Sequence, residues 1–267
     1  MSSASHRRDG FVRALFGASL QTLWPATCAA CDRAIPDEAL FCAACNLSIN
    51  PLCGVCPGCA LPMLDSAARA PGDPRSRCRT CRRVPFPFSG ASSGFEYGEA
   101  LAEALVRMKH GGRRDLGRRL ARLLVQPLAE ALARGGFRDG DLVVPVPLHP
   151  SKLRARGFNQ ALELARWSLA GLAAARALKA RGAWPRLERH LLRRIRATRE
   201  LGHAGPAARL AEVTGAFAVA DTDRVTGRRV LLVDDVFTTG ATFTACTTAL
   251  LSAGAHRVHA LSLARAV

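Results

Sequence analysis

Residues 228–242, with the sequence RRVLLVDDVFTTGAT, decide the fold of this 267-residue chain. The apolar run from Val230 to Val233 predicts a central strand of a parallel sheet. Asp234 and Asp235 follow at the carboxyl end of that strand, where open α/β sheets place their ligand crevice. Residues 238–242 then supply hydroxyls and unobstructed backbone N–H groups at the start of a helix, where an anion is favoured. The segment therefore predicts a strand–turn–helix unit suited to a sugar phosphate.

The same segment resembles the phosphoribosyl pyrophosphate (PRPP) motif of the type I phosphoribosyltransferases, which has an apolar run, two acidic residues and a loop of the form T-T/G-G-T/A-T. The resemblance implies that Asp234 and Asp235 hold the ribose hydroxyls of PRPP. It also implies that the 5-phosphate is held by the loop Thr238, Thr239, Gly240, Ala241 and Thr242. The alternative is an ordinary strand-to-helix turn without a ligand, and the length of the matching pattern favours PRPP.

Length and composition indicate a globular protein. A chain of 267 residues can form one α/β domain and a small accessory domain, and 49% hydrophobic residues indicate a packed core. The longest apolar stretch, residues 11–24, is too short to span a membrane and contains Arg13 and Gln21. No A-x-A cleavage site follows it before Cys28, so we expect an amphipathic helix within residues 1–24 rather than a signal peptide.

The formal net charge of +17 attracts anions in general, including nucleic acid, pyrophosphate and acidic lipid. Only three of the 38 basic residues are lysines, namely Lys109, Lys152 and Lys179, and alanine is abundant as well. This bias towards arginine and alanine is typical of a GC-rich coding sequence. The arginines alone are therefore weak evidence for DNA binding, and the rare lysines are more informative.

Nine of the ten cysteines lie between Cys28 and Cys81, mostly in C-x-x-C pairs. Two such pairs can bind one tetrahedral Zn²⁺ through four thiolates. The first expected zinc site is Cys28, Cys31, Cys42 and Cys45, and the second is Cys56, Cys59, Cys78 and Cys81. Cys53 also precedes Cys56 by C-x-x-C spacing, so it either replaces Cys56 as a ligand or is a free thiol. Four thiolates leave no open coordination position on the metal, so we expect the zinc to be structural. We expect metal binding rather than redox chemistry from these C-x-x-C pairs, and metal-bound cysteines are typical of a reducing cytoplasm.

The second half of the chain alternates helical and strand patterns. A helical pattern runs to Met108, and a longer one spans residues 115–134, where Pro127 is expected to kink or split the helix. Residues 141–147 predict a buried strand that ends in a turn, which His149 is expected to cap. Cys246, alone in the helix after residue 242, is expected to pack in the core.

A basic loop is predicted after that strand, leading into a helix near Asn159. Its cations can surround a multiply charged anion, because guanidinium groups bind phosphate oxygens in pairs. Since pyrophosphate leaves during phosphoribosyl transfer, we expect the pyrophosphate to be bound by Lys152, Arg154, Arg156 and Gly157. The alternative is a solvated basic loop.

The whole pattern resembles the ComF family, which groups the ComFC competence proteins with GntX-type relatives. The resemblance rests on V-P-V-P-L-x7-R-G-F-N-Q from Val144, M-K-H-G-G around Lys109, V-D-D-V-x-T-T-G-A-T from Val233, and the cysteine pairs. It implies an α/β fold, with a type I phosphoribosyltransferase-like parallel sheet flanked by helices and a small N-terminal zinc-binding domain. The expected parts are an N-terminal helix at 1–24, a double zinc-finger region at 25–90 and the phosphoribosyltransferase-like domain at 91–267.

Two functions follow from this resemblance. The first is transfer of phosphoribosyl from PRPP to a small acceptor, where Mg²⁺ would accompany PRPP and the catalytic residues would be Asp234, Asp235 and Lys109. The second is a non-catalytic role in DNA uptake, with single-stranded DNA or a helicase as partner. The family pattern T-x-x-Q-x-x-L-S-x-x-x-R-x-x-N-x-x-x-A-F is altered here, with Leu201, Ala204, Gly205 and Glu212 in place of Gln, Leu, Ser and Asn. The acceptor, the retention of turnover and the oligomeric state therefore stay open.

Overall fold

The computed structural model describes residues 26–36, 38–63, 76–177, 184–199 and 205–267. The helix expected within residues 1–24 lies outside the described residues, as do Leu201 and Ala204. Within the described ranges, no helix combines the length and the hydrophobicity that a membrane crossing requires.

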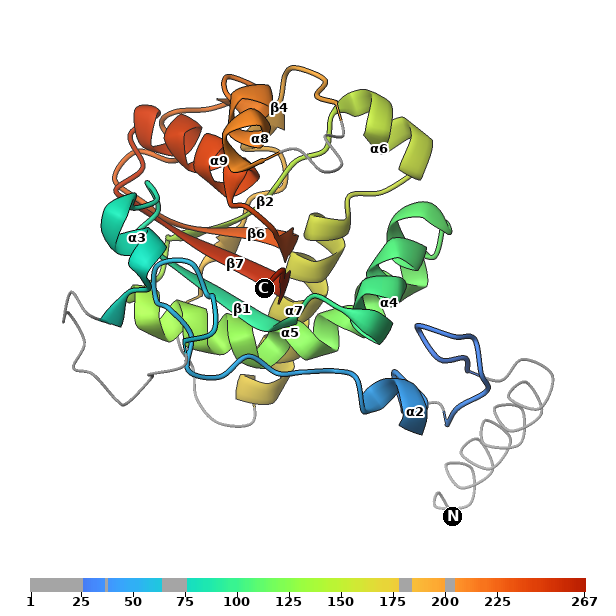
Figure 1. The fold of residues 1–267 in the computed structure, drawn as a ribbon. Helices are drawn as coiled ribbons and strands as arrows, with labels where there is room; N and C mark the ends of the chain where they lie inside the picture. Colours follow the sequence, from blue (N-terminus) through green and yellow to red (C-terminus); the bar gives the residue numbers. More distant parts are fainter. Residues whose placement is uncertain (1–25, 37, 64–75, 178–183, 200–204) are drawn as a thin grey trace, which may run out of the picture.

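A five-stranded parallel sheet forms the centre of the molecule, with the strand order β1-β7-β6-β2-β3 (Figure 1). Its strands are β1 (Gly90–Glu96), β2 (Leu142–Pro145), β3 (Arg186–Leu187), β6 (Arg229–Phe237) and β7 (Arg257–Arg265). The predicted α/β class is confirmed. The apolar run Val230 to Val233 lies in β6, in the middle of the sheet, where both faces are covered and a continuous hydrophobic run is required.

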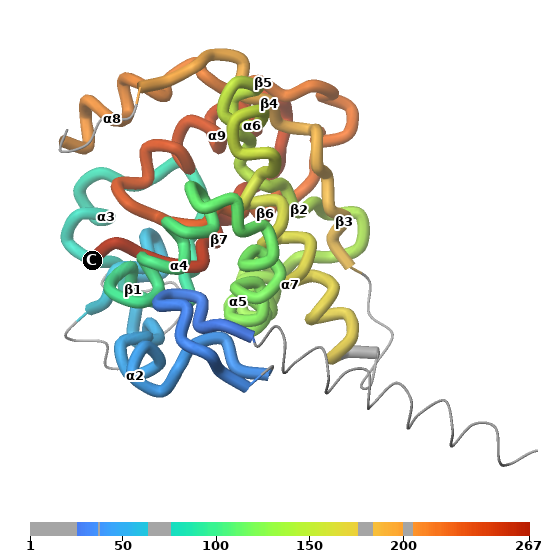
Figure 2. The backbone as a smooth tube through the Cα atoms, turned by 90° about the vertical axis from the view of Figure 1, so that its right-hand side faces the viewer, coloured from blue at the N-terminus to red at the C-terminus, as the bar shows by residue number. Residues whose placement is uncertain are grey.

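Helices cover both faces of this sheet (Figures 1 and 2). Alternate side chains of β6 divide the core, because Leu231 and Val233 pack with one set of helices while Val230 and Leu232 pack on the other face. The first face is covered by α4 (Glu99–His110), α5 (Arg114–Gly135) and α7 (Gln160–Ala177). The second face is covered by α9 (Ala241–Ser252).

The two cysteine-rich segments also divide between the faces. The first segment contains the short helix α2 (Ala43–Asn46), and Cys28 and Cys42 pack into the core on the side of α4 and α5. The second contains α3 (Arg79–Arg83), and Cys56, Cys59 and Cys81 pack into the core on the side of α9. Each segment therefore stabilises a different side of the sheet.

A small antiparallel pair of strands, β4 (Leu192–Arg194) and β5 (Phe217–Val219), lies near the carboxyl end of the sheet with α8 (Pro206–Val213) between them in sequence. The helix α6 (Pro150–Arg156) lies beside this pair in Figure 2. We call residues 192–219, as far as they are described, the hood.

Three local expectations differ from the structure. The predicted basic loop is the helix α6, which ends because Gly157 adopts a left-handed φ of 80°. The helix α5 is not split at Pro127, whose ring packs against Gly94 of β1; a Cβ at Gly94 would lie 2.9 Å from the proline Cγ. Strand β1 itself was not expected, because its small polar residues lack a strand pattern.

Candidate functional site

The strands β2 and β6 are neighbours at the topological switch point of the sheet. Strand β2 ends at Pro145, which pairs with Val233, whereas β6 continues beside β7 as far as Phe237. The chain leaves β2 towards β3 on one side and leaves β6 towards β7 on the other. Such a switch point is where ligands bind in open α/β sheets, and here Asp234 and Asp235 are the first residues of β6 beyond the end of β2.

The acidic pair is largely removed from solvent, and Asp235 is only 4% exposed. The Oδ1 atom of Asp234 accepts a hydrogen bond of 2.9 Å from the Asp235 N–H, and the Oδ1 atom of Asp235 accepts one of 2.9 Å from the Val236 N–H. Burial, and then the neighbouring charge of Asp235, raise the pKa of Asp234 well above its usual range. The pair therefore needs a cation for both carboxylates to be charged together.

Lys109 supplies that cation. It lies in the last turn of α4, and its Nζ forms an ion pair with Oδ2 of Asp235. Burial alone would lower the pKa of Lys109, but the charges of Asp235 and Asp234 outweigh it and raise this pKa. The structure thus brings Lys109 to the acidic pair, across a long separation in the sequence.

The loop from Thr238 to Thr242 joins β6 to α9 as expected. Gly240 caps the helix with a left-handed φ of 85°, and a Cβ there would lie 2.6 Å from a ring carbon of Phe86 and 2.9 Å from one of Phe237. Only glycine satisfies both constraints. The first N–H groups of α9 have no acceptor within the helix, and they carry the positive end of its dipole. The loop is therefore built to receive an anion.

A cavity of about 340 Å³ lies between this loop and the hood. Thr238, Thr239, Ala241 and Thr242 line one side of it. The hood lines the other side with Arg194, Thr198, Arg199, Arg209, Glu212 and Val213. Asp234 and Asp235 do not line this cavity, but Asp234 is close enough to Arg194 to favour the charged form of that guanidinium.

Arg194 is a site residue that sequence reasoning missed. Burial lowers its pKa, and the nearby carboxylate of Asp234 opposes that shift. Its Nη2 atom donates to the Thr198 hydroxyl, and its guanidinium lies 5.3 Å from the centre of the Phe217 ring. In a chain so rich in arginine, nothing in the local pattern distinguishes this position from a solvated one.

The basic segment contributes one residue to the cavity, because Lys152 of α6 is part of its lining. Arg156 is turned aside and donates to Oε1 of Gln160 over 2.7 Å, while Arg154 is exposed to solvent. Gly157 lies in a neighbouring hollow that also includes His149. The expected turn-capping role of His149 is confirmed, since its side chain accepts a hydrogen bond from the Ser151 N–H.

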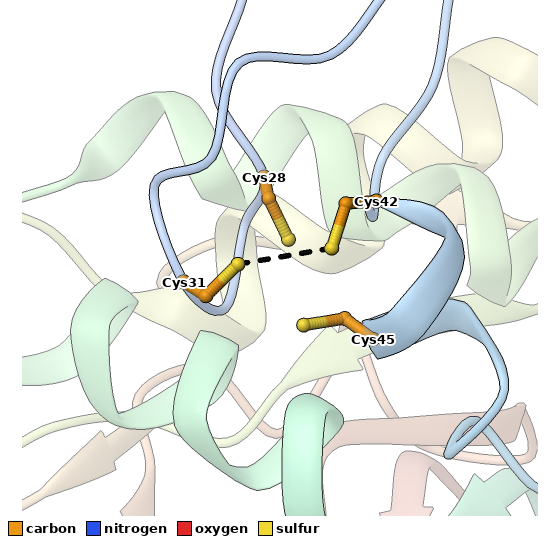
Figure 3. Close-up of side chains that lie close together, drawn as sticks. All are labelled: Cys28, Cys31, Cys42 and Cys45. Atoms are coloured by element: carbon orange, nitrogen blue, oxygen red, sulfur yellow. Dashed lines mark hydrogen bonds between the residues drawn. The ribbon is translucent and has the colours of Figure 1, made fainter.

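Both predicted four-cysteine groups are assembled in the structure. Within each group all four Sγ atoms lie within 4.8 Å of one another, and Figure 3 shows the first group. A tetrahedral Zn²⁺ with Zn–S bonds of about 2.3 Å requires sulfur atoms about 3.8 Å apart. The Sγ atoms of Cys31 and Cys42 are 3.7 Å apart, and those of Cys59 and Cys78 are 3.6 Å apart. The residues therefore fit structural zinc.

The fourth ligand of the second cluster is Cys56 rather than Cys53, which is exposed. The pKa of the Cys56 thiol is lowered to about 4, mainly by a hydrogen bond from Cys59 and against the effect of burial. The Cys78 N–H also donates to the Cys56 Sγ over 3.2 Å. Such backbone donors favour the thiolate form that a metal ion needs.

The chain is similar in sequence to several known proteins. The chain is 30% identical over 198 residues to the DNA utilization protein YhgH of Salmonella typhi, covering 73% of this chain and 80% of the relative. It is 28% identical to the protein of that name from Escherichia coli (strain K12), covering 70% and 77%. It is also 29% identical to Competence protein F of Haemophilus influenzae, covering 64% and 70%.

The chain belongs to the ComF family. No protein-family model matches it. Among solved structures, it is 22% identical to TT1426 from Thermus thermophilus, with a TM-score of 0.27 over 54% of this chain and 72% of that protein.

The hood contains residues 205 and 212, two of the positions where the resemblance leads us to expect other residues. Glu212, in place of the usual asparagine, accepts a hydrogen bond of 2.8 Å from the Arg199 N–H. Arg196 donates to the backbone oxygens of Glu212 and Thr214 over 2.7 and 3.0 Å. The substituted carboxylate therefore has a local structural partner beside the cavity, and Gly205 caps α8 where serine is usual.

Proposed function

We propose that the protein binds PRPP at the carboxyl ends of β2 and β6 and transfers its phosphoribosyl group to a small nitrogen acceptor, releasing pyrophosphate. One observation carries this proposal: an acidic pair neutralised by Lys109 lies at the switch point of the sheet, directly before a phosphate-type loop that opens α9. This is the arrangement that a ligand with both a diol and a phosphate requires.

Each part of the site has a role in this proposal. The hydroxyls of Thr238, Thr239 and Thr242 and the N–H groups at the start of α9 bind the 5-phosphate. Asp234 and Asp235 accept hydrogen bonds from the ribose 2- and 3-hydroxyls. Lys152, which faces the loop across the cavity, is placed to contact phosphate oxygens, whereas Arg154 and Arg156 would have to turn towards the cavity to bind pyrophosphate.

In the reaction, the bond from C1 of ribose to pyrophosphate oxygen breaks and a bond from C1 to the acceptor nitrogen forms. Pyrophosphate leaves with the electron pair, and the nitrogen loses a proton. Positive charge develops on the ribose ring, and the carboxylates of Asp234 and Asp235 stabilise it. The positive charge of Lys109 offsets the repulsion between the two carboxylates, so both can stay ionised. Oxygen ligands of this kind suit Mg²⁺, which would neutralise pyrophosphate when bound with PRPP.

Calorimetry of Mg·PRPP binding tests the proposal. The double variant Asp234→Asn, Asp235→Asn is expected to lose measurable binding, while Asp223→Asn, at an exposed position before β6, is expected to bind as the wild type does. Unchanged affinity in the folded double variant would contradict the ribose assignment. Release of pyrophosphate from PRPP in the presence of nucleobases or amines then tests turnover and identifies the acceptor.

A second function, in DNA utilization or DNA uptake, is supported by the names of the relatives. In this role the partner is single-stranded DNA or a competence helicase. The protein then does not need to catalyse phosphoribosyl transfer, because a fold does not by itself imply an activity. The two cysteine clusters suit a reducing compartment such as the cytoplasm, where thiolates stay available for zinc. Pyrophosphate release separates this role from the first.

A further inference from the structure

A hollow of about 650 Å³ is lined by residues of α5 and α7. These two helices lie on the face of the sheet opposite α9 (Figures 1 and 2). Five arginines, two carboxylates and one indole line the hollow. We call it the α5–α7 groove. Six of its lining residues are Arg114, Arg118, Arg122, Glu163, Arg166 and Trp167. None of them belongs to the acidic pair, the phosphate-type loop or the cavity below the hood.

Trp167 is held in a fixed orientation in this groove. Its Nε1–H donates a hydrogen bond of 3.0 Å to Oε2 of Glu163, which is only 5% exposed. The other carboxylate oxygen of Glu163 accepts two hydrogen bonds from Arg114, of 2.7 and 3.1 Å. Gly117 makes room for this arrangement, since a Cβ there would lie 2.9 Å from the Cβ of Glu163. An ion pair between the exposed Arg114 and the buried Glu163 thus positions an aromatic ring at the surface of two packed helices.

Two guanidinium groups lie against the ring. The Cζ atom of Arg118 is 4.7 Å from the centre of the indole ring, and that of Arg166 is 4.9 Å from it. Both arginines are exposed, as is Arg122. In the part of the chain that the structure describes, none of these three forms an ion pair with a carboxylate. Arg122 donates a hydrogen bond of 3.4 Å to the backbone oxygen of Glu38, and Arg118 and Arg166 contact the indole. With no carboxylate neutralising them, the three guanidinium groups keep a positive charge for an anionic ligand.

The arginines are also spaced regularly. Arg114, Arg118 and Arg122 follow each other every four residues along α5, so their Cα atoms are about 6 Å apart along the helix axis. Arg119, by contrast, is fixed: it donates a hydrogen bond of 2.8 Å to the carbonyl of Thr27, next to the first cysteine cluster. The groove therefore presents a row of cations, and the first cysteine segment is anchored at its side.

We propose that the α5–α7 groove binds single-stranded nucleic acid, with phosphates on the guanidinium groups of Arg118, Arg122 and Arg166. At least one of the two guanidinium groups that lie against the Trp167 ring then turns to a phosphate, and one unpaired base stacks on the ring in its place. A row of cations matches a repeating anion better than a single phosphate, and the indole adds a surface that only a flat, apolar group can use. A base within a duplex is already stacked on its neighbours and cannot reach the indole. The groove is therefore expected to bind single strands more tightly than duplexes. This inference goes beyond PRPP binding and gives the DNA-related function a place on the molecule.

The test is fluorescence anisotropy of a labelled oligothymidylate with the full-length, zinc-containing protein at several salt concentrations. Trp167→Ala is expected to weaken binding about 5- to 100-fold, and Trp167→Phe to retain most of it. The double variant Arg118→Gln, Arg122→Gln is expected to lower the slope of log affinity against log salt by about 1.4. Arg257→Gln removes the same kind of charge at the amino end of β7 and is expected to leave affinity and slope unchanged.

Equal affinity of the wild type and Trp167→Ala for the oligothymidylate would overturn the proposal. So would a loss of affinity in the double arginine variant that is no larger than the loss in Arg257→Gln. Duplex DNA that binds as tightly as the single strand would overturn it as well. Trp167 is partly buried, so circular dichroism and zinc content are measured for each variant. If Trp167→Ala does not fold, the affinity and salt dependence of the double variant at the exposed Arg118 and Arg122 are the test. Calorimetric PRPP binding by the same variants separates the two proposals, because groove variants are expected to keep it.

Discussion

The Nε atom of Arg265 donates a hydrogen bond of 2.8 Å to the backbone oxygen of Cys59. The same guanidinium donates through Nη1 to the backbone oxygens of Phe237 and Thr238, over 2.9 and 2.6 Å. Arg265 is only 5% exposed, and burial lowers its pKa while the charge of Cys59 opposes that shift. One buried cation therefore joins the second cysteine cluster to the start of the loop before α9.

Replacing this arginine tests that connection. Arg265→Met removes the side-chain donor from the carbonyl groups of Cys59, Phe237 and Thr238, of which Phe237 keeps the Ala266 N–H, so we expect the free energy of unfolding to fall by about 1–3 kcal/mol. We also expect weaker PRPP binding, because the loop loses its support, and partial recovery in Arg265→Lys, which keeps the charge but not the fork. Urea unfolding and calorimetry measure both effects. Arg257→Met, on an exposed position of the same strand, serves as the control.

Metal analysis of the purified protein is expected to find two zinc ions per chain. Cys31→Ser removes a ligand of the first cluster and Cys81→Ser a ligand of the second, so each variant is expected to keep one ion. Cys53→Ser is expected to keep two, because Cys53 is exposed and outside both clusters. Loss of zinc in Cys53→Ser would contradict the ligand assignment. Only Cys81→Ser is expected to weaken PRPP binding, through Arg265.

Gly240→Ala is expected to destabilise the protein for two separate reasons. A left-handed φ costs a non-glycine residue about 1–2 kcal/mol, and overpacking against Phe86 and Phe237 costs about 1–3 kcal/mol. Gly112→Ala isolates the first effect, because Gly112 has a φ of 64° and no atom within 4 Å of a Cβ. Chemical denaturation of both variants gives the difference, and equal losses would show that crowding at Gly240 is unimportant.

Lys109→Met removes the cation that balances Asp234 and Asp235. We expect the free energy of unfolding at pH 7 to fall by about 1–3 kcal/mol, less than for a fully buried pair because the Lys109 side chain is 23% exposed. The loss should shrink as the pH falls, since protonation of Asp234, whose pKa is already raised, relieves the uncompensated charge. Urea unfolding at pH 7 and pH 5 measures this. Lys109→Arg, which keeps the charge, provides the comparison.

His259 predicts a second dependence on pH. Its imidazole is 7% exposed in β7, with Nε2 3.1 Å from the Ser92 hydroxyl, and burial lowers its pKa to about 4 from a usual 6.5. The unfolded chain therefore binds a proton at His259 below about pH 6.5 that the folded protein refuses until about pH 4. Stability should fall through this window as the pH falls, by about 2 kcal/mol between pH 7.5 and pH 5.

The variant His259→Gln removes this titration. It is expected to lose less stability between pH 7.5 and pH 5 than the wild type does, which urea unfolding at the two pH values measures directly. Both proteins contain the same cysteine clusters, so any effect of acid on zinc binding is common to them and cancels in the difference. Identical losses in the two proteins would show that His259 does not take part.

Several elements could be predicted because their signal is local. The strand β6, the loop before α9 and the helix itself follow from one continuous stretch, since an apolar run, two acids and a glycine each have a direct backbone consequence. The cysteine clusters follow from spacing, because two C-x-x-C pairs can converge on one tetrahedral ion. The cap at His149 is local as well.

Other elements could not be predicted because their signal lies elsewhere in the chain. The small residues of β1 form a strand only because β7 pairs with them and Pro127 of α5 packs against Gly94. The segment around Lys152 lacks a clear helical pattern, and it forms α6 between the His149 cap and a left-handed Gly157. Here tertiary contacts and terminal geometry outweigh the local propensity.

The sequence by itself determined the central strand, the phosphate-type loop, the two cysteine clusters and membership in the ComF family, because each depends on residues that are close together or regularly spaced. Only the tertiary structure decided which charged groups act together. Lys109 meets Asp235, Arg265 meets Cys59, and Arg118 meets Trp167 across separations that no local pattern encodes. An arginine or lysine has the same local sequence signature whether it is solvated or buried, and its partner is chosen by the packing of the sheet and its helices.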